Sequence, residues 1–245
     1  MKSISRRAFV RNSMAASAAM AASAATMTSD KAFGQGRTGR RLKIIGICCS
    51  PRKAKTTAAS LQICLEAARE AGPNIEAELL ELAGLKIEGS VAAGIPLEPG
   101  QKDDFPKLIP KLSDPEVGGI IIGTPVYFGN MTSLCKAFLD RCIAFRKNNF
   151  ALSNKVAGVL AVGGARNGGQ ETAIQSVQAA LLCQEMIIVG DGRPSARIGA
   201  TVWNDGKGDV TQDEFGMSTA RNLGRRVAEV ALRVNGITRY KIRPY

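Results

Sequence analysis

The chain alternates short apolar runs with longer helix-forming segments, and this alternation constrains its fold more than any other feature. The apolar runs have the length of buried strands and lie at residues 42–49, 75–82, 117–122, 156–162 and 186–189. The helical segments lie at residues 58–71, 103–112, 131–145, 170–182 and 213–234. Strands that alternate with helices predict an α/β fold with right-handed crossovers. We expect a doubly wound five-stranded parallel sheet, in the strand order 2-1-3-4-5, with helices on both faces.

The N-terminal residues resemble a twin-arginine export signal. Ser5-Arg-Arg-Ala-Phe-Val-Arg11 contains the twin arginines and a hydrophobic residue two places after them. An Ala-rich stretch from Met14 to Met27 follows, and it is too short and too rich in small residues to span a membrane. We therefore expect a signal peptide at 1–34 and a folded domain at 35–245, exported to the periplasm with no transmembrane segment. The alternative is a disordered tail of alanine and serine.

Composition limits the chemistry that side chains can supply. The sequence contains no histidine, which excludes Ser-His-Asp triads, Cys-His dyads and zinc sites that use histidine. The formal net charge of +12 suits a basic surface around an anionic ligand, with nucleic acid or an anionic membrane as the alternative. Aromatic residues make up only 5% of the chain, which argues against stacking-based binding of single-stranded nucleic acid. No basic run carries a groove-reading motif either, so we expect no nucleic-acid partner. Redox chemistry would have to come from a bound cofactor.

Polar or glycine-rich segments follow the first, third and fourth predicted strands. The carboxyl ends of parallel strands meet at one edge of a doubly wound sheet, where ligands bind. The first segment offers hydroxyl and basic side chains just before a helix, which suits a phosphate monoester: Ser50, Arg52, Lys55, Thr56 and Thr57. It matches neither the Walker A pattern nor G-x-G-x-x-G. The alternative is a capping loop, in which Thr56 or Thr57 caps the helix.

The other two segments suit a flat ring. The second carries two aromatic side chains flanked by glycine and proline, and its candidate residues are Pro125, Val126, Tyr127, Phe128, Gly129 and Asn130. The alternative is a tight turn with both aromatic side chains in the core. The third segment has four glycines among residues 163–169, which let the backbone approach a ligand closely. Its alternative is a flexible surface loop.

Taken in this order, the three segments resemble the NADPH-dependent FMN reductase superfamily, whose fold is flavodoxin-like. The resemblance covers about 42–190 and is closest to the iron–sulfur flavoprotein branch. It implies bound FMN and a homo-oligomer. It also implies phosphate contacts from Ser50, Arg52, Thr56 and Thr57, and flavin contacts from residues 125–130. Gly164, Arg166 and Asn167 would close the site.

The chain departs from the iron–sulfur branch at the cluster cysteines. The frame around them persists as Lys86-Ile-Glu-Gly and Asp103-Asp104, but the cysteine positions hold Ser90, Ala93 and Pro96. None of these side chains ligates a cluster as a thiolate does, so we expect FMN without an iron–sulfur cluster. The six cysteines of the chain lie elsewhere, without metal-like spacing, and are expected to be buried small hydrophobes. We expect no metal site, and the sequence does not decide whether any of the cysteines form disulfides.

The resulting hypothesis is an FMN-binding oxidoreductase or electron-transfer flavoprotein. It would take electrons from a small-molecule or protein donor and reduce a quinone, a flavin or another small acceptor. No catalytic side chain is expected, because the flavin carries the chemistry. Free NAD(P)H is not expected outside the cytoplasm, so the donor stays open. The alternatives are a non-catalytic binding protein for FMN or another anionic ligand, and an assembly module with a vestigial site.

Overall fold

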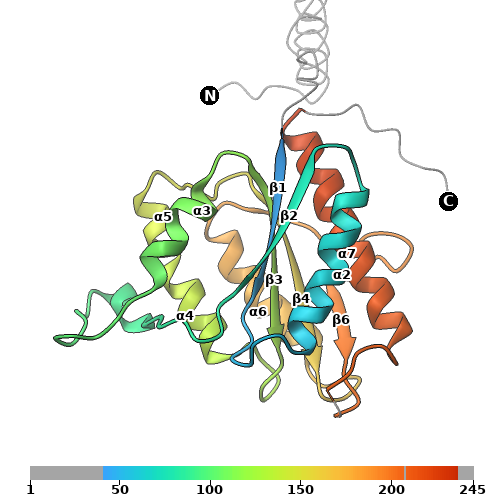
Figure 1. The fold of residues 1–245 in the computed structure, drawn as a ribbon, viewed down its shortest axis with the longest axis horizontal. Coiled ribbons are helices and arrows are strands. Elements are labelled where there is room, and N and C mark those ends of the chain that lie inside the picture. Colours follow the sequence, from blue (N-terminus) through green and yellow to red (C-terminus); the bar gives the residue numbers. More distant parts are fainter. Residues whose placement is uncertain (1–40, 207, 237–245) are drawn as a thin grey trace, which may run out of the picture. The chain divides into compact units, whose positions relative to one another are not determined.

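The computed structural model describes residues 41–206 and 208–236, which form a parallel sheet between two layers of helices (Figure 1). The strands are β1 Leu42–Cys48, β2 Ile75–Glu81, β3 Val117–Pro125, β4 Val156–Gly163, β5 Ile187–Ile188 and β6 Ala200–Trp203. Their order is β2-β1-β3-β4-β5, with β6 also paired to β4. The predicted flavodoxin-like fold and strand order are confirmed. The predicted signal peptide lies outside the described residues.

Two short strands in series occupy the outer position beside β4. β5 pairs with Val156 and Ala157, and β6 pairs with residues 160–163, both in parallel. The chain leaves the sheet between them, over residues 190–199. The sequence predicts no strand in the polar segment 190–212, so β6 is a correction. Its four residues give too short a pattern to recognise, and its pairing depends on β4, which is distant in the sequence.

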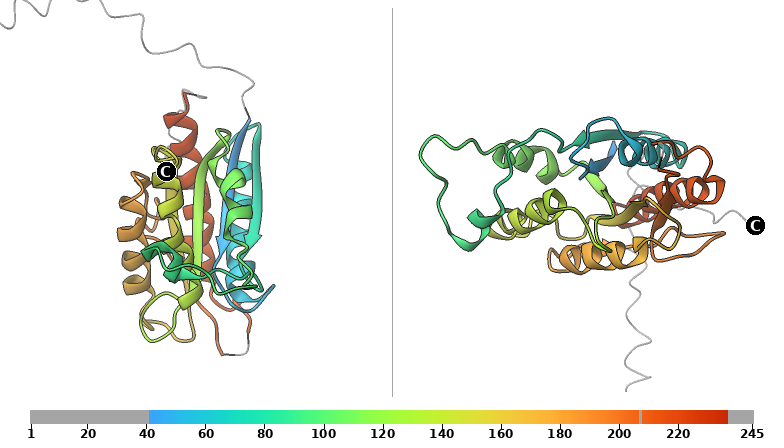
Figure 2. Two further views of the ribbon diagram at one scale, coloured as in Figure 1. Left: turned by 90° about the vertical axis from the view of Figure 1, so that its left-hand side faces the viewer. Right: turned by 90° about the horizontal axis from the view of Figure 1, so that it is seen from below.

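Each face of the sheet has its own apolar core. β1 sends Ile45 and Ile47 to one face and Ile44 and Cys48 to the other, as the alternation of a strand requires. The first face packs against α3 Ile109–Ser113, α4 Ser133–Arg141, α5 Ile143–Lys147 and α6 Gln170–Leu182. The second packs against α2 Thr56–Glu70 and α7 Glu214–Val234. Figure 2 shows the two layers on either side of the sheet. Within the described part of the chain, no helix combines the length and apolarity needed to cross a membrane.

Two predicted helices differ in detail from the observed ones. The segment predicted as helix 131–145 begins at Ser133, because the Thr132 hydroxyl accepts a hydrogen bond from the Cys135 N–H at 3.1 Å and caps α4. It then divides at Cys142 into α4 and α5. The segment predicted as helix 103–112 is a 3₁₀ turn, η3 Phe105–Leu108, followed by α3.

Residues 84–104, here called the arm, extend beyond α4 in Figure 1 and contain one 3₁₀ turn, η2 Gly89–Ala93. Both ends of the arm are fixed by aspartates. Asp104 is buried and exchanges hydrogen bonds with the backbone of Lys86. Asp103 accepts two bonds from the guanidinium of Arg141, at 3.1 and 2.6 Å. Arg141 also donates to the Glu88 carbonyl at 3.1 Å, so α4 anchors both sides of the arm.

Candidate functional site

Four loops lie at the carboxyl edge of the sheet, the lower edge in Figure 1. We call them loop 1 (49–55, after β1), loop 2 (126–132, after β3), loop 3 (164–169, after β4) and loop 4 (204–206 and 208–213, after β6). Loops 1 to 3 contain most of the residues predicted from the sequence. Loop 4 was not predicted, because its position at this edge depends on β6.

Loop 1 leads into a helix whose N-terminus has no side-chain cap. Lys55 is the N-cap residue, and no side chain caps the first turn of α2. Thr56 and Thr57 are the first two helical residues and both are buried. The capping alternative is therefore wrong. The first N–H groups of a 15-residue helix remain available, together with the positive end of its dipole. This combination suits an anion such as a phosphate.

Loop 1 is also positively charged and sharply turned. Its basic side chains Arg52, Lys53 and Lys55 are exposed, and none of them forms an ion pair within the described residues. The Ser50 hydroxyl accepts a hydrogen bond from the Arg52 N–H at 3.1 Å. Ala54 has a left-handed φ of 51°, and its N–H donates to Glu81 on β2 at 2.7 Å. The loop is thereby held in one shape with a positive surface.

Loop 2 is a tight hairpin that projects its aromatic side chains outward. Tyr127 and Asn130 exchange backbone hydrogen bonds at 2.9 and 3.1 Å. Phe128 and Gly129 form the turn between them, with left-handed φ values of 49° and 73°. Phe128 is fully exposed and Tyr127 is 45% exposed, so the alternative that placed both in the core is wrong. A bulky residue with positive φ is uncommon, and such strain concentrates at functional sites.

Direct contacts join loop 2 to loops 1 and 3. The Thr132 hydroxyl donates to the Cys49 carbonyl of loop 1 at 2.8 Å. On the other side, a Cβ atom on Gly169 would lie 2.7 Å from the Cα of Gly129, so the two loops touch through their glycines. Pro125 is buried as the last residue of β3, and Val126 is half-buried beside it. The structure therefore brings together the three segments predicted from the sequence.

Loop 3 is exposed and is hydrogen-bonded to the first residue of α6. Gln170 at the start of α6 donates to the Ala165 carbonyl at 2.7 Å and accepts from the Gly168 N–H at 2.8 Å. Gly164, Arg166 and Asn167 are exposed. The Arg166 guanidinium forms an ion pair with Asp213 and lies 5.7 Å from the centre of the Trp203 ring. Of the predicted residues, Arg166 is the one directed toward loop 4.

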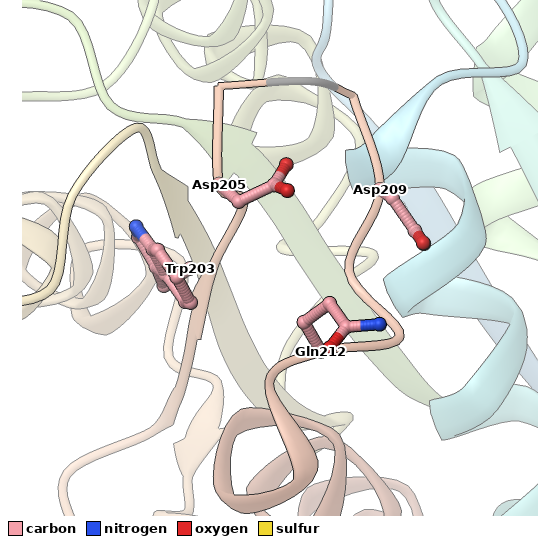
Figure 3. A pocket seen from close by; sticks show the side chains of 4 residues that line it. All are labelled: Trp203, Asp205, Asp209 and Gln212. Atoms are coloured by element: carbon pink, nitrogen blue, oxygen red, sulfur yellow. The ribbon is translucent and has the colours of Figure 1, made fainter.

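Loop 4 borders a hollow that no pattern in the sequence predicts. Figure 3 shows its lining side chains, Trp203, Asp205, Asp209 and Gln212. Trp203 is the only tryptophan of the chain and ends β6, so its position was the one signal in the sequence that could have marked this loop. The Asp209 carboxylate accepts from the Thr211 N–H and hydroxyl, which lowers the pKa of Asp209.

The thiols near the site are unsuited to nucleophilic chemistry. Burial raises the pKa of Cys48 to about 11 and raises that of Cys49 well above its ordinary value, so both stay protonated. Five of the cysteines are buried as expected, but Cys183 is exposed, which corrects that prediction. Nowhere in the described residues do three or more cysteine or carboxylate groups gather as metal ligands would. The geometry suits an anionic ligand with a flat portion, and the absence of a catalytic side chain stays a prediction.

Comparison with known proteins agrees with this geometry. The family described as NADPH-dependent FMN reductase matches residues 42–200. An iron-sulfur flavoprotein of Methanocaldococcus jannaschii is 41% identical over 192 residues, which cover 77% of this chain and 97% of the relative. An NAD(P)H dehydrogenase (quinone) of Paracoccus denitrificans is 32% identical over 183 residues, which cover 68% of this chain and 83% of the relative.

A solved structure shows the same fold at lower identity. The flavodoxin, WrbA-like protein from Agrobacterium tumefaciens superposes with a TM-score of 0.55 and 21% identity. The alignment covers 79% of this chain and 98% of that structure. At this identity the likeness supports the fold alone.

Proposed function

Because the chain belongs to the NADPH-dependent FMN reductase family, and is thus an FMN-dependent oxidoreductase, we propose that FMN binds at the carboxyl edge across loops 1 to 3. The observation that carries this placement is the uncapped N-terminus of α2. Its N–H groups and the nearby hydroxyl and basic side chains suit the FMN phosphate. The residues that would hold the phosphate are Ser50, Arg52, Lys55, Thr56 and Thr57.

Loops 2 and 3 offer room and a polar edge for the isoalloxazine ring. Apart from the immediate chain neighbours, no residue has an atom within 4 Å of a Cβ atom built on Gly129 or Gly164, so the surface there is open. Tyr127 and Phe128 are exposed beside this opening. The residues that would contact the ring and the ribityl chain are Pro125, Val126, Tyr127, Phe128, Gly129, Asn130, Gly164, Arg166 and Asn167.

Bound FMN would supply the redox chemistry, while this chain's residues bind and orient it. We propose a quinone, a free flavin or another small molecule as the acceptor, and the name of the P. denitrificans relative supports a quinone. A nicotinamide nucleotide is the donor that the family name suggests. A different small-molecule or protein donor is required if the protein acts outside the cytoplasm.

An iron–sulfur cluster is not part of this proposal, although several relatives are named iron-sulfur flavoproteins. Residues 84–102, where the resemblance places the cluster motif, contain no cysteine. Ser90, Ala93 and Pro96 occupy its cysteine positions. Iron analysis of the purified protein tests this point, and stoichiometric iron with sulfide would contradict it.

Export through the twin-arginine pathway to the periplasm is a second part of the proposal, supported by Arg6 and Arg7 in their signal-like context. This pathway carries folded proteins, so FMN could be loaded before export. Replacing both arginines by lysine should keep the protein in the cytoplasm. Unchanged periplasmic recovery of that variant would contradict the export proposal.

The phosphate placement is tested by comparing FMN with riboflavin, which lacks the phosphate. Titration of flavin-free protein, followed by flavin fluorescence, should give an affinity for FMN at least about 100-fold higher than for riboflavin, because charge-assisted bonds to the phosphate would be lost. Equal affinities would contradict the role of α2. Two negative results together would favour the non-catalytic binding protein. Neither NAD(P)H nor another donor would reduce the bound FMN, and no quinone would reoxidise FMN that dithionite has reduced.

A further inference from the structure

Asp213 is a buried carboxylate in loop 4 with an unusual set of partners. Its side chain has 0% exposure. One oxygen accepts from the Gly216 N–H at 2.9 Å and so caps α7, and the other accepts from the Trp203 N–H at 2.7 Å. A buried charge is costly unless it is paired and fully hydrogen-bonded. The guanidinium of Arg166 supplies the opposite charge.

Asp213 holds Arg166 in place but leaves part of its guanidinium free to bind another group. The ion pair engages one end of the guanidinium, and the indole of Trp203 lies beside it at 5.7 Å. Its side chain nevertheless stays 51% exposed. Since a guanidinium has five N–H donors, several remain available at the carboxyl edge. Arg166 is therefore a fixed cation in loop 3, whose glycines touch the hairpin of loop 2.

We propose that Asp213 is a positioning residue, which holds the Arg166 guanidinium at the carboxyl edge so that it can donate to bound FMN. The inference rests on the proposed flavin site. It adds loop 4 to the site, through a residue that contacts no flavin itself. The positive charge near the flavin would favour the electron-rich reduced state, so the pair would influence the flavin potential as well as its binding.

A purely structural account of Asp213 is the competing explanation, because the residue caps α7. Asp213→Asn keeps one oxygen that can cap α7, but it loses both the charge that attracts the guanidinium and the second oxygen that accepts a backbone N–H. Arg166→Gln removes the guanidinium and leaves Asp213 in place. The double variant shows whether the two residues act together.

The experiment measures FMN affinity and flavin midpoint potential for the native protein, D213N, R166Q and the double variant. Trp203 is the chain's only tryptophan, so its fluorescence reports both FMN titration and the state of this cluster. We expect R166Q and D213N each to weaken FMN binding by about tenfold, and we expect R166Q, which removes the positive charge, to lower the potential. The double variant should bind FMN no more weakly than R166Q alone. The matched control is Glu214→Gln, which removes the same charge from the exposed neighbouring residue and should change neither quantity.

The outcomes distinguish this inference from the proposed function. Native protein that fails to bind FMN overturns the proposed function. If native protein binds FMN, additive effects of D213N and R166Q overturn the positioning role and leave a structural one. Tighter FMN binding by D213N overturns it as well, since Asp213 would then compete with the flavin for Arg166. Thermal unfolding of each variant identifies any loss of folding.

Discussion

Thr56 and Thr57 show at the residue scale how backbone position decides which role a side chain has. The sequence supports two roles for them, capping and phosphate binding, because both need a hydroxyl before a helix. The structure places the N-cap one residue earlier, at Lys55, and so leaves the hydroxyls without a capping role. That one-residue difference lies within the usual uncertainty of a helix start, which is why the sequence alone could not decide.

The hydroxyl of Thr57 provides the first prediction. Thr57→Val keeps the shape of the side chain but removes its hydroxyl, so the FMN dissociation constant should rise about tenfold. The matched control is Ser60→Ala, one turn further along α2, whose hydroxyl donates to the Thr56 carbonyl at 2.9 Å. It should bind FMN as the native protein does. Equal FMN affinities in Thr57→Val and the native protein would remove Thr57 from the site.

At the element scale, the arm shows how one ion pair and a carboxylate bonded to the backbone replace regular secondary structure. Residues 84–104 contain only one 3₁₀ turn, yet both ends are fixed by Asp103 and Asp104. The irregular course of the arm could be predicted from its glycines and prolines. Its anchoring could not, because Arg141 lies 38 residues from Asp103 in the sequence. The same holds for β6 and loop 4, whose places depend on β4.

The Arg141–Asp103 pair should contribute strongly to stability. Arg141→Leu leaves Asp103 without its partner and the Glu88 carbonyl without its donor, so the free energy of unfolding should fall by about 3 kcal/mol. Lys136→Met, on the same helix, removes an exposed ion pair with Asp140 and should cost less than about 1 kcal/mol. Urea unfolding measures both. Similar losses in the two variants would mean that the arm is not anchored through Arg141.

The arm should also loosen in acid. A hydrogen bond from Lys107 and, to a lesser extent, one from the Lys86 backbone lower the pKa of Asp104 to about 2. The hydrogen bonds from Arg141 lower the pKa of Asp103. Because both values lie below the ordinary pKa, near 4, the stabilisation is complete above that pH and is lost as the pH falls toward 2. Acid-stable proteases should then cleave the arm faster at pH 2 than at pH 4. Asp104→Asn should reduce that difference, and an unchanged pH dependence in the variant would assign the effect to other groups.

Close packing of α2 against α7 provides a test at the same scale. A Cβ atom on Gly224 would lie 1.9 Å from the Cys64 carbonyl oxygen, so Gly224→Ala should lower stability by about 3 kcal/mol. At Gly89 in the arm, a Cβ atom would meet only ordinary contacts at 3.4 and 3.5 Å, so Gly89→Ala should be tolerated. Thermal unfolding compares the two. Equal midpoints would show that the two helices can separate without cost.

At the scale of the whole molecule, the fold and the cofactor were the most predictable features. Long apolar runs such as Val117–Pro125 determine strands locally, and three loops after such strands meet at one edge in any doubly wound sheet. The +12 charge fits an anionic ligand but does not identify one. Export to the periplasm, assembly into a homo-oligomer and the identity of the electron donor stay predictions.

The most direct test is the visible absorption spectrum of the mature protein, purified from periplasm and compared before and after acid release of its cofactor. We predict flavin bands, release of stoichiometric FMN, and no broad absorption from an iron–sulfur cluster. Loss of the bands on adding a donor, and their return with a quinone, would extend the result to turnover. A colourless protein that also fails to bind added FMN would contradict the central claim.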